Sequence, residues 1–443
     1  MLNKFLFTRV DNSPLVVFRV IFGLLIFLEA TGAIFTGWVK KTLVDPKFTF
    51  NFIGLDFLQP LPGNGMYFYY AVMGIFGLLV MLGYKYRFSM GAYTVMWAGV
   101  YFMQKSSYNN HYYLLLLLCF IMFLLPASRY FSLDAKYNPS YKKISMPRWC
   151  TLIVILQVWI VYIYAAVAKL YPDWLDLSVV KMLMVPREHY FLIGGLLQQK
   201  WAHIVITYSG ILFDLLIVPL LLCRTTRKWA FIASIFFHLF NSFVFHIGIF
   251  PYMSMAFALF FFEAETIRSL FLKKKKLYTD HEVIIPNYKK PLLIFGSIYF
   301  MVQIALPLRH WFIKDNVLWT EEGHRLSWRM MLRGKSGMIS FQVLNHTTGN
   351  RYKVNLDDYL SSKQRQRIAT KPDMIWQFAQ YLKKEYAKKG DSISVYVSTS
   401  KVSVNRGPWQ DFVKPDIDIA NKPWHYFKHE DWIYPYKQDS IKD

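Results

Sequence analysis

Long apolar segments recur throughout residues 1–308, and they constrain the fold more than any other feature of the sequence. A helix that crosses a membrane needs about 20 mostly apolar residues. Nine segments approach that length: residues 14–36, 66–83, 88–104, 108–126, 149–168, 203–223, 229–246, 248–262 and 291–308. The sequence therefore predicts a mainly α polytopic membrane protein with about nine transmembrane helices.

The composition agrees with this prediction, since 54% of the residues are hydrophobic and 19% are aromatic, which is high for a soluble protein. The three cysteines, Cys119, Cys150 and Cys223, show neither a disulfide framework nor the spacing of a metal site. The first apolar segment lacks a clear signal-peptide cleavage site, which favours a first transmembrane helix. Segment 188–199 is apolar but too short to span, so we expect it to be interfacial or re-entrant.

Lysine and arginine are distributed unevenly between the predicted loops. If the N-terminus lies inside, the inner loops contain 19 of these residues and the outer loops contain 8. Because basic loops tend to stay in the cytoplasm, this bias places the N-terminus there and the residues after 308 on the opposite side. Basic loops that face anionic lipid also explain the net charge of +23, and we favour them over nucleic-acid binding.

The residues after 308 follow a different pattern. Segments 338–345 and 351–356 alternate in polarity around the turn sequence HTTGN, which predicts a β-hairpin. Apolar residues recur at helical spacing from Pro372, and this pattern ends at Gly390. Segment 392–405 alternates again, as expected for a strand.

We therefore divide the chain into a transmembrane helical domain, residues 1–308, and a small C-terminal mixed α/β domain outside the membrane, residues 309–443. The second domain is basic, with 23 Lys and Arg against 15 Asp and Glu. A basic surface would attract glutamate-rich peptides, or it could lie against anionic headgroups.

With this topology, several polar side chains gather toward the outer face of the membrane. Polar residues within apolar segments are costly, so each is a candidate for function or for pairing. The candidates are Glu29, Asn109, Asn110, His111, Lys169, Asp214, His238, Asn241, Ser242 and His246. Their convergence on one side favours a functional site but does not name a reaction.

Each candidate also has a structural interpretation. Lys169 ends an apolar segment, so it could be an anchor that extends to the lipid headgroups, or it could be a base. His111 could be a hydrogen-bonded structural residue. His238 and Asn241, three residues apart on one helix face, could join helices instead of binding a substrate. Asp214 could pair with a histidine within the membrane.

The sequence patterns narrow the chemistry only in part. The histidines are not paired with carboxylates at helical spacing, so a metal site is weakly supported, although haem ligation by histidines on different segments stays open. The glycine-rich phosphate-binding motifs are missing. A lysine in a desolvated pocket makes a good base because burial favours its uncharged form. Lys169 would therefore suit proton abstraction from a lipid-soluble substrate.

Six stretches of the sequence carry a family resemblance. They are FNFIGLDFLQPLP (50–62), YNNHYYL (108–114), IVYIYAAVAKLYPDWL (160–175), GILFDLL (210–216), FHLFNSFVFHIGIFPY (237–252) and WTEEGHRLSWRMMLR (319–333). In residues and in order, they resemble the vitamin K-dependent γ-glutamyl carboxylases and their related bacterial membrane proteins. The chain has the size of the bacterial members, so we expect a bacterial inner-membrane protein with a periplasmic C-terminal domain.

This resemblance implies an enzyme that uses reduced vitamin K, either phylloquinol or menaquinol, together with oxygen and carbon dioxide and without a metal. In the family, a lysine base deprotonates the hydroquinone and oxygen adds. The resulting alkoxide removes the γ-proton of a glutamate in a protein or peptide substrate. The carbanion then takes up carbon dioxide, which gives γ-carboxyglutamate and vitamin K epoxide.

The same resemblance assigns roles to individual residues. Lys169 in AAVAKL corresponds to the family's base, and His111 in NNH would assist deprotonation of the hydroquinone or stabilise the oxygenated intermediate. Asn110 falls beside His111. The family positions that shape the quinone pocket are matched by His238, Asn241 and Ser242.

The stretch SWRMMLRGK (327–335) differs from the SWDMMVHSR of the animal enzymes. Trp328 is kept, whereas Arg329 replaces an acid, Arg333 a histidine and Lys335 an arginine. The family places this stretch near the glutamate, so we expect these four residues to belong to the quinone and substrate pocket. The animal enzymes continue further and use that extra region to engage a propeptide, to which the resemblance does not extend.

Three hypotheses follow. The first is a γ-glutamyl carboxylase that works at the lipid bilayer on a glutamate-containing protein or peptide. The second, motivated by the altered residues 329–335, is a quinol epoxidase that does not carboxylate glutamate. The third is a non-enzymatic quinone- or lipid-binding membrane protein or transporter. Oxygen uptake with reduced vitamin K and incorporation of carbon dioxide into a glutamate peptide distinguish the three.

Overall fold

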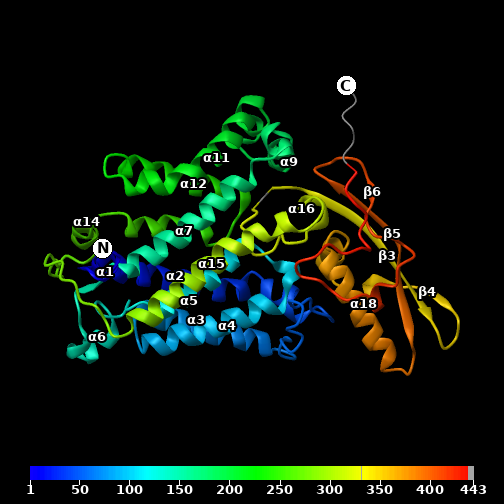
Figure 1. The fold of residues 1–443 in the computed structure, drawn as a ribbon, viewed down its shortest axis with the longest axis horizontal. Coiled ribbons are helices and arrows are strands. Elements are labelled where there is room, and N and C mark those ends of the chain that lie inside the picture. Colours follow the sequence, from blue (N-terminus) through cyan, green and yellow to red (C-terminus); the bar gives the residue numbers. More distant parts are fainter. Residues whose placement is uncertain (331, 438–443) are drawn as a thin grey trace.

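The computed structural model describes residues 1–330 and 332–437, and it shows two parts at opposite ends of the long axis (Figure 1). One part is a bundle of helices that contains the N-terminus. The other part holds the four-stranded sheet, drawn in yellow to red at the right of the figure. Residues 331 and 438–443, which fall within the predicted domain 309–443, lie outside the described residues.

Among the described residues, six helices are long and apolar enough to cross a membrane: α2 (Ser13–Phe35), α3 (Gly65–Leu82), α7 (Trp149–Ala168), α11 (Lys200–Leu222), α12 (Arg227–Phe245) and α15 (Lys289–Leu308), whose candidate span continues to Phe312. The other three predicted spans coincide with helices that do not meet both criteria: α4 (Tyr86–Met103), α5 (Asn110–Leu124) and α13 (Phe250–Ala256), which continues as a 3-10 helix over Phe257–Phe260. The mainly helical character is therefore confirmed, whereas the count of nine spans is not confirmed.

Shorter helices precede or connect the long ones: α1 (Leu2–Phe7), α6 (Leu133–Tyr137), α8 (Pro172–Leu175), α9 (Ser178–Met184), α10 (Gly194–Leu197) and α14 (Ala264–Phe271). Near the N-terminus, the short strands β1 (Arg9–Asp11) and β2 (Ser145–Pro147) pair antiparallel. The segment 188–199, predicted as interfacial or re-entrant, contains α10 and forms no long helix.

Helices α2 and α3 pack closely because two glycines leave the contact free of side chains. A Cβ at Gly23 would lie 2.3 Å from the backbone nitrogen of Met81, and one at Gly77 would lie 2.8 Å from that of Phe27. Small residues permit this close approach of helices in membranes. Helix α4 packs against α3, and the segments after residue 250 pack against α2.

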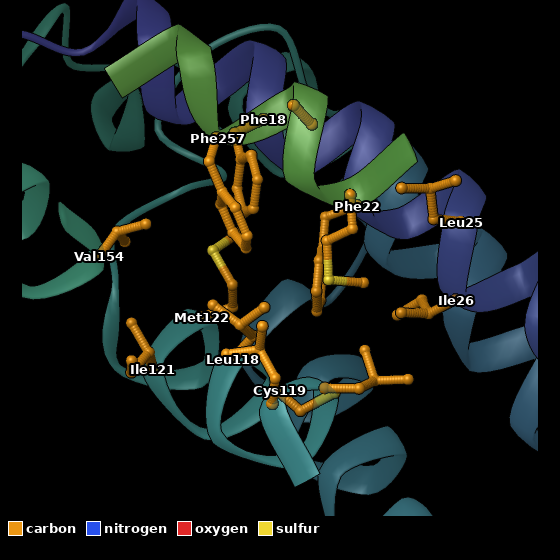
Figure 2. Packing of buried hydrophobic residues seen from close by; sticks show 14 of the residues in the cluster. Phe18, Phe22, Leu25, Ile26, Leu118, Cys119, Ile121, Met122, Val154 and Phe257 are labelled. Carbon is orange, nitrogen blue, oxygen red and sulfur yellow. The ribbon is translucent and has the colours of Figure 1, made fainter. Parts of the chain in front are cut away.

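The core of the bundle joins helices that are far apart in the sequence. Figure 2 shows Phe18 and Phe22 of α2 beside Phe257, facing Met122 and Cys119 of α5. The ring centroids of Phe18 and Phe257 are 5.7 Å apart. Cys119, Cys150 and Cys223 are all free cysteines; the first two are buried and Cys223 is exposed. This core fixes the position of α5, which carries His111 in its first turn.

The C-terminal part contains the strands β3 (Lys335–Asn345), β4 (Arg351–Lys353), β5 (Ile393–Val404) and β6 (Gln410–Asp411), with the helices α16 (Val317–Thr320), α17 (Ser362–Ile368) and α18 (Pro372–Ala387). The antiparallel sheet has the order β4-β3-β5-β6. Helix α18 lies against the sheet (Figure 1) and buries Ile375 and Phe378. The predicted hairpin and the helix that begins at Pro372 are both confirmed.

A buried ion cluster fastens the two parts together. Lys105, in the turn between α4 and α5, places its ammonium 2.9 Å from the carboxylate of Asp373 in α18. Arg325 donates to both oxygens of the same carboxylate, at 3.1 and 3.2 Å. Although burial alone would raise the pKa of Asp373, these two cations lower it to about 2. The carboxylate therefore stays ionised and holds the C-terminal part over the outer ends of the helices.

Candidate active site

A cavity of about 500 Å³ lies between α7, α9, α11 and α12 and the start of α13. Most of its wall is apolar or aromatic. Its polar and ionisable lining side chains are His111, Tyr162, Lys169, Ser209, Asp214, His238 and Asn241. An apolar pocket of this size with a few converging polar groups is typical of a small-molecule site.

Lys169 follows the last residue of α7, and its side chain turns back into the protein. The ammonium forms an ion pair with the carboxylate of Asp214 and donates to the backbone carbonyl of Ala165 at 3.3 Å. It also lies 5.8 Å from the ring centroid of Trp174. Only 12% of the Lys169 side chain is exposed, so the ammonium does not extend to the surface as a headgroup anchor would.

Asp214 is a candidate from the sequence to which neither the residue pattern nor the family resemblance gave a role. Its position within an apolar helix suggested a buried partner, and a histidine within the membrane was one possibility. The partner is Lys169, and 8% of the Asp214 side chain is exposed. Because a charge inside a membrane helix is costly unless it is paired, the lysine offsets the cost of burying this carboxylate. A carboxylate within the motif GILFDLL was the only signal in the sequence.

His238 lies on the cavity wall that α12 contributes. Its Nε2 is 3.1 Å from the hydroxyl of Tyr162 on α7, and its ring packs edge-on against Phe213 and Phe237, each 5.5 Å away between centroids. The side chain is buried, with 2% exposed. This histidine therefore both joins two helices and presents a polar ring to the cavity, as the two interpretations of the sequence allowed.

His111 reaches the same cavity from α5. Asn109 caps this helix by accepting a hydrogen bond from the backbone N–H of Tyr112 at 2.7 Å, so His111 falls in the first turn. The centroid of its ring lies 4.1 Å from that of Phe250, at the start of α13. The ring centroids of Phe250 and His238 are 6.3 Å apart, with the rings edge-on. One aromatic ring thus lies against both histidines.

The remaining membrane candidates differ in position. Asn241 lines the cavity, whereas Ser242 is not among the lining residues and donates to the hydroxyl of Tyr252 at 3.4 Å. Asn110 does not line the cavity either. It accepts from the hydroxyl of Tyr108 at 2.7 Å and donates to the backbone carbonyl of Arg329 at 3.1 Å. Asn110 therefore holds the loop that precedes β3.

That loop closes the cavity from the C-terminal side. Met330 lines the cavity, and Trp328 is buried with its ring stacked on Tyr113 of α5, 4.7 Å away. Trp328 has a φ of 59°, a strained conformation for a bulky residue. The ring stacking and the hydrogen bond from Asn110 together stabilise this loop conformation.

A second cavity, of about 700 Å³, lies on the other side of the turn that carries Lys169. It is lined by Ala168 and Leu170, the neighbours of Lys169, and by Arg329 and His310. A guanidinium nitrogen of Arg329 lies 3.2 Å from Nε2 of His310. The turn at Lys169 therefore separates an apolar cavity from a more polar one that contains a guanidinium group.

Two family models match successive parts of the chain. The HTTM domain matches residues 7–265, and the lumenal domain of vitamin K-dependent gamma-carboxylase matches residues 288–439. The protein belongs to the vitamin K-dependent γ-carboxylase family. No solved structure matches the chain.

The resemblance stated from the sequence motifs is thereby confirmed. Both matched regions contribute to the apolar cavity of this carboxylase-family protein, since Lys169, Asp214 and His238 belong to the HTTM region and Met330 belongs to the lumenal region. The lumenal match begins at residue 288 and so includes α15. The candidate site is therefore formed by residues from both of the regions that the family models match.

Arg333 and Lys335 of the carboxylase-family protein lie in a buried cluster around Glu321 and line neither of the two cavities. Glu321 accepts from Nε of Arg333 at 2.9 Å and from Lys371 at 2.5 Å, and Nζ of Lys335 lies 3.9 Å away. Burial alone would raise the pKa of Glu321, but the surrounding cations hold it well below its usual range. Burial lowers the pKa of Lys371 to about 8. The resemblance assigned Arg333 and Lys335 to the quinone and substrate pocket but gave no sign of the carboxylate that binds them.

The cluster around Glu321 contains more positive than negative side chains. Three basic side chains surround the single carboxylate of Glu321, and Lys335 packs over the ring of Phe412, 4.4 Å from its centroid. Burial lowers the pKa of Lys335 well below its ordinary value. Within the described residues, no group of three or more His, Cys, Asp or Glu side chains could hold a metal ion.

Proposed function

We propose that this protein is a vitamin K-dependent γ-glutamyl carboxylase in which Lys169 is the base that deprotonates the quinol. The observation that carries this proposal is the ion pair of Lys169 and Asp214 in an apolar cavity at the boundary between the membrane helices and the lumenal domain. Membership of the carboxylase family supports the reaction class.

The cavity suits reduced vitamin K in size and chemistry. Its volume of about 500 Å³ lies within the range of about 300–1,000 Å³ that is usual for small-molecule sites. Phe213, Phe237 and Phe250 offer flat apolar surfaces for a fused ring, and Lys169 and His111 offer polar atoms for its hydroxyl groups. Bound there, reduced vitamin K would supply, with oxygen, the strong base that takes the γ-proton of glutamate.

Lys169 and Asp214 together can handle the proton of the quinol hydroxyl. A lysine accepts a proton only in its uncharged form. Inside a water-poor cavity, a proton shift from the ammonium to the carboxylate replaces two charges with two neutral groups, which removes the cost of burying them. The amine then accepts the hydroxyl proton, and Asp214 keeps the side chain directed into the cavity.

The two histidines would hold the quinol from the other walls. His111 would hydrogen-bond one of its oxygens, and Phe250 fixes the ring plane of that imidazole. His238 is oriented by the hydroxyl of Tyr162, which leaves its other ring nitrogen for a contact with the ligand. Asn241 would add a further polar contact from α12.

The glutamate side of the reaction is proposed at Arg329. Its guanidinium lines the second cavity beside the turn that carries Lys169, where a carboxylate of an acidic peptide could accept hydrogen bonds from it. His310 lies against the same group and would add a second polar contact. The position of this cavity supports approach of the peptide from the lumenal side.

A quinol epoxidase without glutamate carboxylation is the second candidate function. The observation that favours it is the engagement of Arg333 and Lys335 by Glu321, because two of the cations expected near the glutamate are bound within the protein. Arg329 is then the principal remaining cation of the 327–335 stretch for a substrate carboxylate.

The two candidates are separated by one paired assay. Purified protein in lipid nanodiscs is supplied with reduced vitamin K, oxygen, labelled carbon dioxide and a glutamate-rich peptide. A carboxylase forms epoxide and labels the peptide. Epoxide without labelled peptide would leave only the epoxidase, and oxygen consumption that does not exceed the protein-free rate would refute both.

A further inference from the structure

A third cavity, of about 920 Å³, lies at the end of the helical bundle that is opposite the lumenal domain. Its walls come from the first half of α2, the end of α3, the segment around α6, and residues 270–275, which include the last two residues of α14. In Figure 1, α6 and α14 lie beside the N-terminus, at the left. The cavity is therefore remote from the candidate active site.

One wall of this cavity is apolar and exposed. Phe131 and Leu270 are each 64% exposed, and Phe271 is 56% exposed. Leu82, at the end of a candidate membrane span, continues the same wall. Such side chains at the end of a membrane bundle face acyl chains at low cost, whereas they would be unfavourable against water.

The rest of the lining is strongly basic and contains no acidic residue. Lys136, Lys142, Lys273 and Lys274 are exposed, and among the described ion pairs none involves these four side chains. Lys142 lies over the ring of Tyr130, 5.1 Å from its centroid, which holds its ammonium at the cavity.

The nearby carboxylates are already engaged. Asp11 pairs with Lys275 at 2.6 Å, and Asp134 accepts from the backbone N–H groups of Lys85 and Tyr86 at 2.7 and 3.0 Å. The positive charge of the four lysines therefore has no counterpart in the lining, and an external anion would relieve their mutual repulsion.

Arg19 forms the floor of the cavity and adds a buried cation. It is 1% exposed and donates to the backbone carbonyls of Ala127 and Tyr130 at 3.1 and 3.2 Å. Its Nε has no hydrogen-bond partner among the described residues. A buried donor without a partner is costly, and an acceptor that reached this nitrogen from the cavity would remove that cost.

We propose that this cavity binds the phosphate headgroup of an anionic phospholipid, with its acyl chains along the wall of Leu82, Leu270 and Phe271. A cationic rim next to an apolar wall at the membrane boundary matches both halves of such a lipid. Free phosphate shares the headgroup chemistry but would leave the apolar wall exposed, and a zwitterionic lipid would leave the lysines without net compensation. The proposal is independent of the reaction at Lys169.

The test compares lipids and two triple variants of the purified, delipidated full chain. Binding of phosphatidylglycerol and phosphatidylcholine is measured by native mass spectrometry. We expect phosphatidylglycerol to bind the natural protein at least about tenfold more tightly, because each basic side chain near an anionic surface adds to the attraction. K136Q/K142Q/K274Q should lose this preference. The control, K40Q/K41Q/K181Q, removes the same charge at the opposite end and should keep it.

Several outcomes would overturn the proposal. Equal affinity for the two lipids would show that the cavity does not select an anionic headgroup. An equal loss of the preference in both triple variants would assign it to the general surface charge of the protein. Displacement of phosphatidylglycerol by inorganic phosphate at the same concentration would assign the site to a free anion. Phe271→Ser, which leaves the lysines in place, should weaken binding of the lipid, and unchanged binding would refute the role of the apolar wall. Retention of the natural unfolding temperature shows that the variants fold.

Discussion

Lys169, directly after α7, and Asp214, within α11, form an ion pair inside an apolar cavity, and both side chains are almost completely buried. The lysine side chain could reach the membrane surface from its helix end, yet its ammonium is directed to the carboxylate. The pair places a proton donor and a proton acceptor beside the space proposed for the quinol.

We expect Asp214→Asn to lower the turnover number for epoxide formation by about tenfold to a hundredfold. The amide cannot take the proton that Lys169 must lose, although it preserves the shape of the carboxylate. Asp214→Glu should restore part of the activity because it restores the carboxylate. The measurement is epoxide formation in nanodiscs at saturating and limiting quinol, which separates turnover from the Michaelis constant.

Glu29→Gln is the matched control for Asp214→Asn, since Glu29 is also an acid within a candidate membrane span but does not line the cavity. Its activity should stay close to that of the natural protein. Full activity of Asp214→Asn, or an equal loss in the two variants, would contradict a specific role for the carboxylate beside Lys169.

Arg329→Gln should raise the Michaelis constant for a glutamate-rich peptide by roughly ten- to a hundredfold, because it removes charge-assisted hydrogen bonds to a carboxylate. Epoxide formation in the absence of peptide should change little. The control is Arg367→Gln, which alters an exposed arginine of the same domain. An unchanged Michaelis constant in Arg329→Gln would remove this residue from the peptide site.

Asp373→Asn should strongly destabilise the junction of the two parts. It leaves the cations of Lys105 and Arg325 buried without a counterion, and loss of one partner of a buried pair typically costs about 3–5 kcal/mol. Asp411→Asn is the control, because its ion pair with Lys401 is exposed at 3.7 Å and such pairs contribute about 0–1 kcal/mol. Thermal unfolding in detergent should show a clear decrease only for Asp373→Asn, and equal decreases would contradict the buried junction.

The segment around His429 should loosen as the pH rises above neutrality. The 2.7 Å hydrogen bond between His429 and Glu322 raises the pKa of the imidazole above its ordinary value of 6.5, with Asp315 adding to the effect and Lys314 opposing it. A raised pKa means that the folded state binds the proton more tightly. This stabilisation is fully present below about pH 6.5 and is lost as the pH rises through the higher value in the folded protein.

Hydrogen exchange of residues 425–436, corrected for the intrinsic rate at each pH, measures this effect. Protection should fall between pH 6 and pH 9 in the natural protein and should depend much less on pH in His429→Gln. His346→Gln, which removes a histidine that bonds to Ser394 in the same domain, is the control and should behave like the natural protein. A pH dependence that persists in His429→Gln would assign it to another group.

Much of the architecture could be predicted because apolar segments and alternating strands are local patterns. The hairpin of β3 and β4 and the helix α18 follow directly from residues adjacent in sequence. The number of spans could not be fixed in the same way. Helices α5 and α13 are short, and whether they cross a membrane depends on their neighbours rather than on their own composition.

The candidate site was predictable in part for the same reason. Charge bias and apolar segments placed His111 and Lys169 at the outer ends of their spans and His238 in the middle of its span, and all three line one cavity. The partner of Asp214 was not predictable, because the depth of a residue along its helix does not determine which neighbouring helix faces it. Likewise, the stretch containing Arg333 gave no sign that Glu321, twelve positions earlier, would bind it.

The most direct test of the proposed function is epoxide formation by variants of Lys169. Lysine and arginine serve equally well as membrane anchors, but arginine does not give up its proton. Lys169→Ala and Lys169→Arg should both insert and fold, yet reduce oxygen-dependent formation of vitamin K epoxide by at least about a hundredfold. Lys181→Ala, which changes an exposed lysine on α9, should retain full activity. Undiminished epoxide formation by folded Lys169→Arg or Lys169→Ala would contradict the role of Lys169 as the base.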